Sequence, residues 1–188
     1  MELAKIFGSK ARLKMLRLFL FNKDTQLGLD DVMARTKLSK ESARKELAAL
    51  LDANFLRMKG QRAATRYQCN PRFEHLDALN TFIRETTNAK PKNIINALRK
   101  AGTLRLVALS GHFTGVVESR IDLLIAGDNI NERTLAAVVH SLEAELGREI
   151  RYAHFATADF RYRLGVFDRL LRDVFDYPHR LLIDRIGL

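Results

Sequence analysis

The sequence is poor in the residues that crosslink small domains or hold structural metals. It has one cysteine among 188 residues. This single Cys69 excludes an internal disulfide framework and the cysteine-rich zinc sites. No stretch approaches the roughly 20 uncharged apolar residues of a membrane helix, and the first residues lack the apolar core and cleavage site of a signal peptide. We therefore expect a cytoplasmic protein that does not contact a membrane.

The motifs of the common enzyme and cofactor classes are also missing. The chain has no Walker loop, no visible Ser-His-Asp arrangement and no zinc motif. Its 5 histidines never recur at the i, i+4 spacing of a helical metal site. We expect neither a cofactor nor a bound metal.

Acidic residues are scarce in the first third of the chain. Residues 1–68 carry 15 Lys and Arg against 7 Asp and Glu, a net charge of +8, whereas residues 69–188 carry 17 against 15, a net charge of +2. Positive charge concentrated in one part of a chain favours a polyanionic partner, and phosphate contacts would make the affinity sensitive to salt. A basic surface that only keeps the protein in solution is the alternative.

Apolar periodicity predicts helices in this basic part. Ser9 is placed to cap a helix whose Leu13 and Phe19 belong to one broad apolar face. A shorter helix is expected over 29–34, and residues 36–39 are typical of a tight turn.

A third helix is expected after Ser39, which can cap it. Its helical spacing separates a buried stripe from an exposed face. We expect burial of Ala43, Leu47, Leu50 and Leu51, and exposure of Glu41, Ser42, Arg44, Lys45 and Glu46. Phe55 and Leu56 then begin a strand, and residues 57–69 indicate two short strands around a loop with Gly60.

The order helix, helix, turn, helix and hairpin resembles the winged helix-turn-helix family of bacterial regulators. The fragment SKESARKELAALLDANFLRMKGQRAATRYQCN carries the resemblance, through its capped Leu-rich helix, its basic hairpin and its closing Arg-Tyr-x-x-Asn. The resemblance covers about the first 70 residues. It implies that helix 39–53 enters the major groove of duplex DNA, which is wide enough for a helix.

The exposed N-terminal half of this helix would supply the contacts with bases. Arg44 is the best candidate for a bidentate contact with guanine, whereas Lys40 and Lys45 suit phosphates. The hairpin cations are expected to reach the DNA backbone or the minor groove. The predicted DNA-binding residues are Lys40, Ser42, Arg44, Lys45, Lys59, Arg62 and Arg66. The alternative is a solvated surface without a partner.

A further amphipathic helix is expected over 71–86. Pro71 suits its first turn, where the missing N–H costs nothing. Phe73, Leu76, Leu79 and Ile83 lie on one face of it. This helix either connects two domains, pairs with its copy in a dimer, or packs on the first domain.

Helices and short strands alternate after residue 91, which favours an α/β arrangement. Asn131 is placed to cap one of the helices, and Phe160, Tyr152, Tyr162 and Phe167 are interpreted as core residues. Strands are expected over 104–109, 120–127 and 149–155, and helices over 92–100, 132–146, 158–164 and 167–175.

The segment ALSGHFTGVVESRIDLLIAGD resembles the nucleotidyltransferase fold of the polymerase-beta-like superfamily. In that family a strand leads into a Gly-Ser turn, and the next strand carries two acids that bind divalent metal for nucleotidyl transfer. The resemblance covers roughly residues 92–188. The tail ATADFRYRLGVFDRLLRDVFDYPHRLLI looks like that of regulators that join a winged helix to such a domain.

The chain departs from the catalytic pattern where metal would bind. His112 follows Gly111 where the family has Ser, and Arg120 stands where the first acid is expected, so only Asp122 remains. Arg120 and Asp122 lie two residues apart on one face of the expected strand, where they can pair. We therefore expect an inactive relative without catalytic residues. Gly111, His112, Arg120 and Asp122 would form a vestigial site for a small phosphate-bearing effector, since Arg suits phosphate; a structural or dimerising domain is the alternative.

These expectations describe an α+β protein with three parts. A winged helix-turn-helix domain is expected over 1–70, a linker helix over 71–90 and an inactive nucleotidyltransferase-like domain over 91–188. We expect a transcriptional regulator that forms a homodimer and binds double-stranded DNA. Two alternatives stay open: a nucleotidyltransferase that modifies protein or RNA with a metal-bound nucleoside triphosphate, and a module whose winged helix binds protein.

Overall fold

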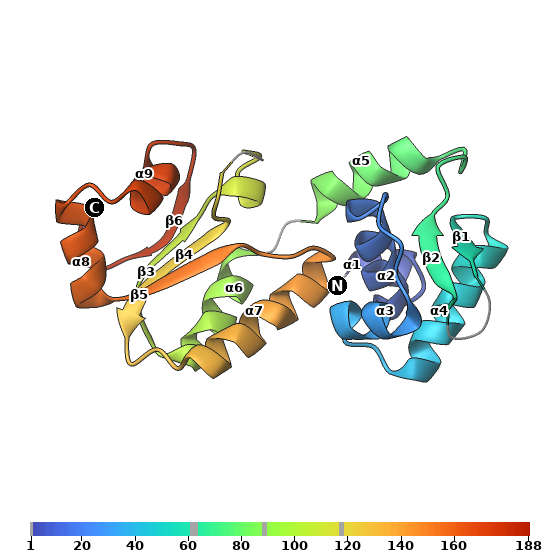
Figure 1. Cartoon of the computed structure of the whole chain (residues 1–188), viewed down its shortest axis with the longest axis horizontal. Helices are drawn as coiled ribbons and strands as arrows, with labels where there is room; N and C mark the ends of the chain where they lie inside the picture. Colours follow the sequence, from blue (N-terminus) through green and yellow to red (C-terminus); the bar gives the residue numbers. More distant parts are fainter. Residues whose placement is uncertain (1, 61–63, 88–89, 117–118) are drawn as a thin grey trace. The chain divides into compact units, whose positions relative to one another are not determined.

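The computed structural model describes residues 2–60, 64–87, 90–116 and 119–188 (Figure 1). The chain has a mixed α+β fold, as the sequence predicts. Its contacts divide it into two compact units. Unit 1 comprises Met1–Asn88 and His140–Arg148, and unit 2 comprises Ala89–Val139 and Glu149–Leu188. Within the described ranges, none of the helices combines the length and apolar composition needed to cross a membrane.

Unit 1 begins with helices that pack around a shared apolar core. They are α1 (Glu2–Ile6), α2 (Lys10–Phe21), α3 (Leu29–Thr36) and α4 (Lys40–Asp52). Ser9 caps α2 as predicted, because its hydroxyl accepts a hydrogen bond from the N–H of Arg12 at 2.9 Å. Ser39 caps α4 in the same way, at 3.3 Å from the N–H of Ser42. The short α1 was not predicted.

Glu46, which the sequence predicts to be exposed, is buried at 5% exposure. Its carboxylate accepts hydrogen bonds from the Ser9 hydroxyl at 2.9 Å and from Nε of Arg12 at 2.7 Å. The prediction was wrong because Glu46 faces α2, where these two donors satisfy its charge. Buried carboxylates persist when they are paired and hydrogen-bonded in this way.

The predicted hairpin is present. Strand β1 (Leu56–Lys59) pairs antiparallel with β2 (Arg66–Cys69), with Lys59 opposite Arg66 at the loop end. The turn after β1 needs glycine: Gly60 has φ +82°, and a Cβ there would lie 2.6 Å from the carbonyl oxygen of Ala64. Leu27 forms a β-bridge with Tyr67, which ties β2 to the loop before α3.

Helix α5 (Leu76–Thr86) starts later than predicted. The expected start at Pro71 was wrong because the Asn70 side chain accepts from the N–H of Arg72 at 3.1 Å, which holds this segment in a turn. Of the alternatives for this helix, the structure shows packing on unit 1. Ile83 is fully buried in the core of that unit, with Leu76 and Leu79 against it.

Unit 2 contains a four-stranded sheet of order β5-β4-β3-β6. Strands β4 and β5 are parallel, and the other neighbours are antiparallel. The strands are β3 (Thr103–Leu109), β4 (Leu123–Asp128), β5 (Tyr152–Ala156) and β6 (Arg180–Asp184). The helices are α6 (Pro91–Leu98), α7 (Glu132–Leu146), α8 (Thr157–Gly165) and α9 (Arg169–Phe175), and α7 runs on into the part of the chain assigned to unit 1.

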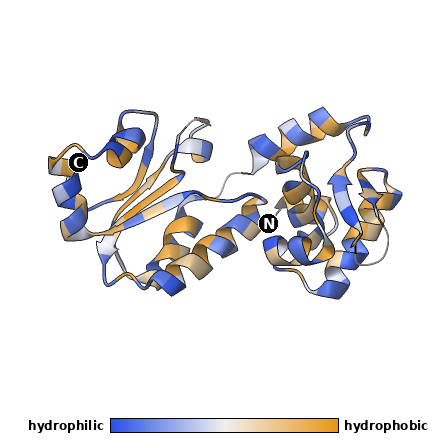
Figure 2. Ribbon diagram, viewed as in Figure 1, coloured by the Kyte–Doolittle hydropathy of each residue, from blue (hydrophilic) through white to orange (hydrophobic). Residues whose placement is uncertain are grey.

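The central strands of this sheet are apolar on both faces, as Figure 2 shows for β3 and β4. Leu106 and Leu124 pack with Phe160 of α8 and Val174 of α9. Alternate residues such as Val107 point to the other face, on the side where α6 and the start of α7 lie in Figure 1. Asn131 caps α7 as predicted, accepting from the N–H of Thr134 at 2.8 Å.

One predicted strand boundary and several predicted core residues of unit 2 were wrong. The second strand begins at Leu123 and not at Arg120. Tyr152, Tyr162 and Phe167, predicted as core residues, are 36%, 70% and 80% exposed, whereas Phe160 is fully buried. Tyr162 is exposed because α8 presents only one face to the sheet and Tyr162 lies two residues away from Phe160, on the outer side. Phe167 lies beyond the end of α8, and Tyr152 is the first residue of β5, which is at the edge of the sheet.

Candidate nucleic-acid interface

The N-terminal half of α4 presents a row of exposed cations. Lys40, Arg44 and Lys45 are exposed, and Ser42 is half-buried beside its cap. The rotation of α4 is fixed by Ala43, Leu47 and Leu50, which are buried in the core of unit 1. Because these apolar residues fill one side of the helix, the three cations face solvent.

The hairpin adds cations of its own. Lys59 and Arg66 are exposed and lie opposite each other in register. Arg66 makes one contact within the hairpin, from Nη1 to the carbonyl oxygen of Thr65 at 3.3 Å. The predicted contact residue Arg62 lies outside the described residues.

A hollow of about 580 Å³ joins α4 to the hairpin. It brings together Lys40 and Arg44 from α4 with Arg66 from β2, so the structure places three predicted site residues around one cavity.

Asp30 and Asp31, at the start of α3, line the same hollow. Asp31 is occupied as a cap, because its carboxylate accepts from the N–H of Gly28 at 2.8 Å. Sequence patterns had not connected these two acids with the site.

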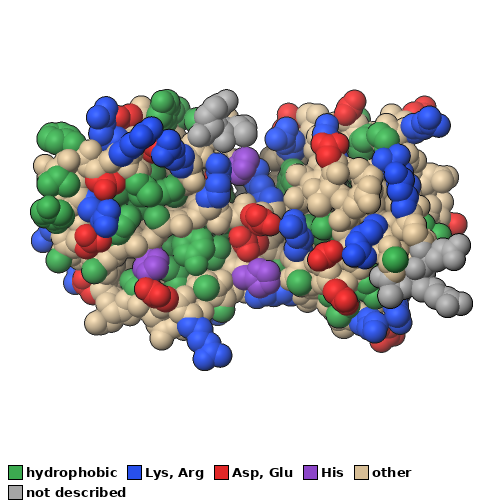
Figure 3. Space-filling view, viewed as in Figure 1, with side chains coloured by type: hydrophobic (Ala, Val, Ile, Leu, Met, Phe, Trp, Pro, Cys, Tyr) green, Lys and Arg blue, Asp and Glu red, His purple; other side chains and the backbone are tan. Residues whose placement is uncertain are grey.

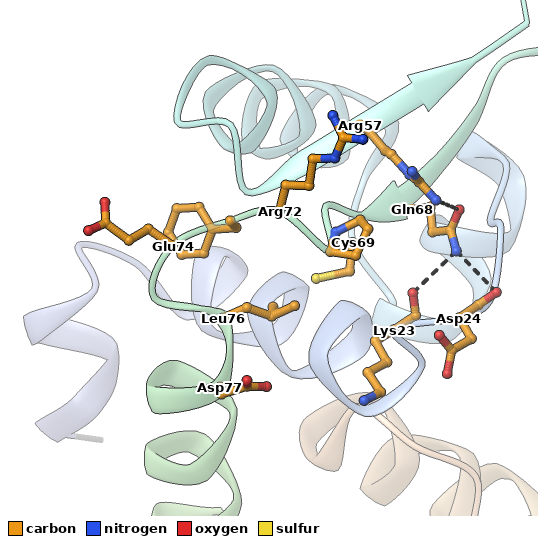
Figure 4. A pocket seen from close by; sticks show the side chains of 11 residues that line it. Lys23, Asp24, Arg57, Gln68, Cys69, Arg72, Glu74, Leu76 and Asp77 are labelled. Carbon is orange, nitrogen blue, oxygen red and sulfur yellow. Dashed lines mark hydrogen bonds between the residues drawn. The ribbon is translucent and has the colours of Figure 1, made fainter.

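A second hollow, of about 540 Å³, lies at the base of the hairpin (Figure 4). Arg57 donates to Gln68 at 3.0 Å, and the Gln68 amide donates to the carbonyl oxygens of Lys23 and Asp24. These bonds anchor the hairpin to the loop after α2. The lining mixes basic side chains with acids, so the hollow favours no single sign of ligand charge.

Cys69 at this hollow is buried at 2% exposure. Burial raises the pKa of its thiol to about 11. At neutral pH the side chain is therefore a neutral, apolar group and not a nucleophile, since the thiolate is the reactive form.

In unit 2, the single remaining acid of the expected metal site is fully occupied. Asp122 is 1% exposed. One carboxylate oxygen accepts from the N–H of His112 at 2.8 Å and from Nη2 of Arg151 at 2.9 Å. The other accepts from Nε of Arg151 at 2.9 Å and from its N–H at 3.0 Å. Burial alone raises the pKa of Asp122, but the hydrogen bonds from Arg151 and His112 outweigh it and lower the pKa below its ordinary value.

The predicted pairing of Arg120 with Asp122 was wrong. Nε of Arg120 lies 3.1 Å from the carboxylate of Asp173 on α9, and the partner of Asp122 is Arg151. Neither residue belongs to β4, so the expected same-face spacing does not apply. Sequence analysis missed Arg151, because no local pattern connects it to an acid 29 residues earlier.

The residues of the predicted phosphate site are therefore only partly brought together. Gly111 and His112 lie at Asp122, and a Cβ at Gly111, where φ is +52°, would collide with the Asp122 side chain. Arg120 instead forms an ion pair with Asp173 on α9. Through the described ranges, no three His, Cys, Asp or Glu side chains are grouped to hold a metal ion. The donor set around Asp122 does not fit the metal that the resemblance implies, because the Arg151 guanidinium and the N–H groups of His112 and Arg151 occupy the lone pairs that a cation would use.

Five arginines of unit 2 form ion pairs with carboxylates. The pairs are Arg105–Asp128, Arg120–Asp173, Arg151–Asp122, Arg163–Asp159, Arg163–Asp168 and Arg172–Asp176. Basic and acidic side chains are intermingled on the visible face of this unit (Figure 3). By contrast, Lys40, Arg44, Lys45 and Lys59 have no ion-pair or hydrogen-bond partner for their side chains in the described part of unit 1.

Comparisons with protein-family models, curated proteins and solved structures find no match for this chain. The function proposed below therefore depends on the residues and geometry of this chain.

Proposed function

We propose that this chain is a transcriptional regulator that binds duplex DNA through a winged helix-turn-helix domain in unit 1. Helix α3, the turn at Lys37–Ser39 and helix α4 form the helix-turn-helix, and β1–β2 form the wing. The observation that carries the proposal is the set of exposed cations on α4 and the wing, Lys40, Arg44, Lys45 and Lys59, whose side chains have no partner in the described part of unit 1. Unpaired cations on adjacent elements suit a polyanion, because phosphates supply the counter-charge that the chain does not.

In this proposal α4 enters the major groove with its N-terminal half. Arg44 donates two hydrogen bonds to guanine O6 and N7, and Lys40 and Lys45 contact the flanking phosphates. The Ser42 hydroxyl adds a polar contact. Lys59 and Arg66 reach the sugar-phosphate backbone from the wing, which fixes the register of the protein but carries no base specificity.

We propose for unit 2 a nucleotidyltransferase-like domain that does not transfer nucleotides. The support is the state of Asp122, whose carboxylate is neutralised by Arg151 and hydrogen-bonded to two backbone N–H groups. One acid held in this way cannot also position two divalent ions on phosphates. Incubation with labelled nucleoside triphosphates, Mg²⁺ or Mn²⁺ and cell extract tests this. We expect no transfer, and transfer that Asp122→Ala abolishes would contradict the proposal.

The DNA-binding proposal is tested by the affinity of the full chain for fragments of genomic DNA. Fragments retained at low salt are identified first, and their affinity is measured by fluorescence anisotropy at several salt concentrations. We expect the logarithm of the affinity to fall linearly with the logarithm of salt concentration. Arg44→Ala with Lys45→Ala should weaken binding by about tenfold or more. Lys92→Ala, at an exposed position of α6, is the matched control and should bind like the unchanged chain.

Two results would argue against the proposal. One is the absence of binding at low salt. The other is an equal affinity of the unchanged chain and the Arg44→Ala, Lys45→Ala variant.

A further inference from the structure

The centre of the exposed face of α4 carries an acid. Each residue turns an α-helix by about 100°, so Glu41 lies about 60° from Arg44 and about 40° from Lys45, on the arc between them. The same geometry puts Glu41 about 180° from Leu50, which is buried in the core. Glu41 therefore points directly away from unit 1, with a cation on either side.

Nothing in the described ranges neutralises this carboxylate. Glu41 is exposed and takes part in no ion pair or hydrogen bond there. Glu46, the other acid in the middle of α4, is turned inward and is bound by Ser9 and Arg12. Glu41 is thus the one residue of this helix half that would repel a phosphate, yet it lies where a helix in a groove approaches the bases.

A carboxylate in that position needs hydrogen-bond donors. In the major groove only the amino groups of cytosine and adenine donate. Adenine presents the N7 acceptor beside its amino group, which would repel the second carboxylate oxygen. Cytosine presents only its N4 amino group, and it is the base that Glu characteristically recognises.

We infer that Glu41 selects cytosine in the duplex that α4 binds. The inference rests on the proposed DNA-binding function. It specifies the DNA sequence that is bound, which has a cytosine beside the guanine contacted by Arg44. Residues at i and i+3 are neighbours on a helix surface, so Glu41 and Arg44 reach the same or adjacent base pairs. Together the two side chains recognise cytosine and guanine: the Glu41 carboxylate contacts the cytosine, and the Arg44 guanidinium contacts the guanine.

A structural role for Glu41 makes a different prediction. An acid in the first turn of α4 also interacts favourably with the helix dipole. That role changes the stability of the fold, and it leaves the choice of base untouched. Base preference therefore separates the two roles.

The experiment selects binding sites from a randomised duplex library with the full chain and with three variants. The unchanged chain should select cytosine at one position and lose roughly 5- to 150-fold in affinity when that base pair is changed. Glu41→Gln should select adenine at the same position, because an amide contacts adenine N6 and N7 together. Glu41→Ala should lose the preference at that position only. Asp52→Asn removes an exposed acid from the other end of α4 and should select the same site as the unchanged chain.

The outcomes separate this inference from the function on which it depends. If the unchanged chain selects a sequence and Glu41→Gln selects the identical one, the assignment of Glu41 is overturned and DNA binding stands. A preference of the unchanged chain for adenine opposite Glu41 also overturns the assignment. If the unchanged chain selects no duplex at low salt, both proposals fail.

Discussion

The guanidinium of Arg151 donates a hydrogen bond to each oxygen of the Asp122 carboxylate, from Nε at 2.9 Å and from Nη2 at 2.9 Å. The acid side chain is 1% exposed and the arginine side chain 42% exposed. This pair occupies the place where the resemblance to nucleotidyltransferases implies a metal ligand. The interaction braces the start of β4 against the start of β5.

Arg151→Ala should destabilise unit 2. It leaves a buried carboxylate with two backbone donors in place of a bidentate partner. Breaking a fully buried pair costs about 3–5 kcal/mol, and because Arg151 is half-exposed we expect about 2–3 kcal/mol. Urea unfolding and hydrogen exchange of the β3 and β4 amides measure the loss. Arg172→Ala breaks the exposed pair with Asp176 and should cost no more than about 0.5 kcal/mol; equal losses in the two variants would contradict the special role of Arg151.

The same pair should make stability depend on acid. The pKa of Asp122 is lowered in the folded chain from 3.8, so its contribution is complete above that value and is lost as the pH falls through the folded pKa. The urea midpoint should therefore fall as the pH is taken from about 5 downward. Asp122→Asn lacks the titrating group and should start lower and fall less. Parallel curves for the two proteins would show that Asp122 contributes nothing to the acid transition.

Lys59→Ala tests the wing separately from α4. If Lys59 contacts a phosphate, its loss should weaken binding to all duplexes about equally and reduce the slope of log affinity against log salt by about 1. The selected base sequence should not change. Anisotropy titrations over a range of salt concentrations measure the slope, with Lys92→Ala as the control. An unchanged slope would exclude a phosphate contact by Lys59.

The buried Glu46 should position α4 on α2. Glu46→Ala removes the acceptor of Ser9 and Arg12 and should lower the free energy of unfolding by about 2–3 kcal/mol. Glu46→Gln keeps an oxygen for the Ser9 hydroxyl and should lose less. Asp52→Ala, at an exposed position of the same helix, serves as the reference and should remain within about 0.5 kcal/mol of the unchanged chain. Thermal and urea unfolding compare the three; a loss in Asp52→Ala as large as that in Glu46→Ala would disprove the expected role.

Local sequence patterns were sufficient for most elements of the fold. The caps Ser9, Ser39 and Asn131 marked the starts of α2, α4 and α7, because a hydroxyl or amide oxygen satisfies the free N–H groups of a first turn. The Leu-rich spacing of α4 placed its buried stripe. Lys40, Arg44 and Lys45 could be predicted as exposed for the same reason.

The errors at buried acids came from partners far away in the chain. Glu46 was predicted to be exposed, since its donors Ser9 and Arg12 lie on another helix. Asp122 was assigned to Arg120, its near neighbour, although Arg151 reaches it from the turn before β5. A periodic pattern records which face of a helix or strand is apolar, and it holds no information on which distant charge meets a buried acid. That choice depends on tertiary packing.

The pairing of arginines in unit 2 has a consequence for the kinetics of association. A cation that already faces a carboxylate forms a local dipole, and its field decays faster than that of an isolated charge. Residues 1–68 carry +8 of the net charge of +10, so the long-range field of this chain originates mainly there. A polyanion that approaches therefore exerts a torque that turns this part of the chain toward it, and the rate of encounter should fall as the ionic strength rises.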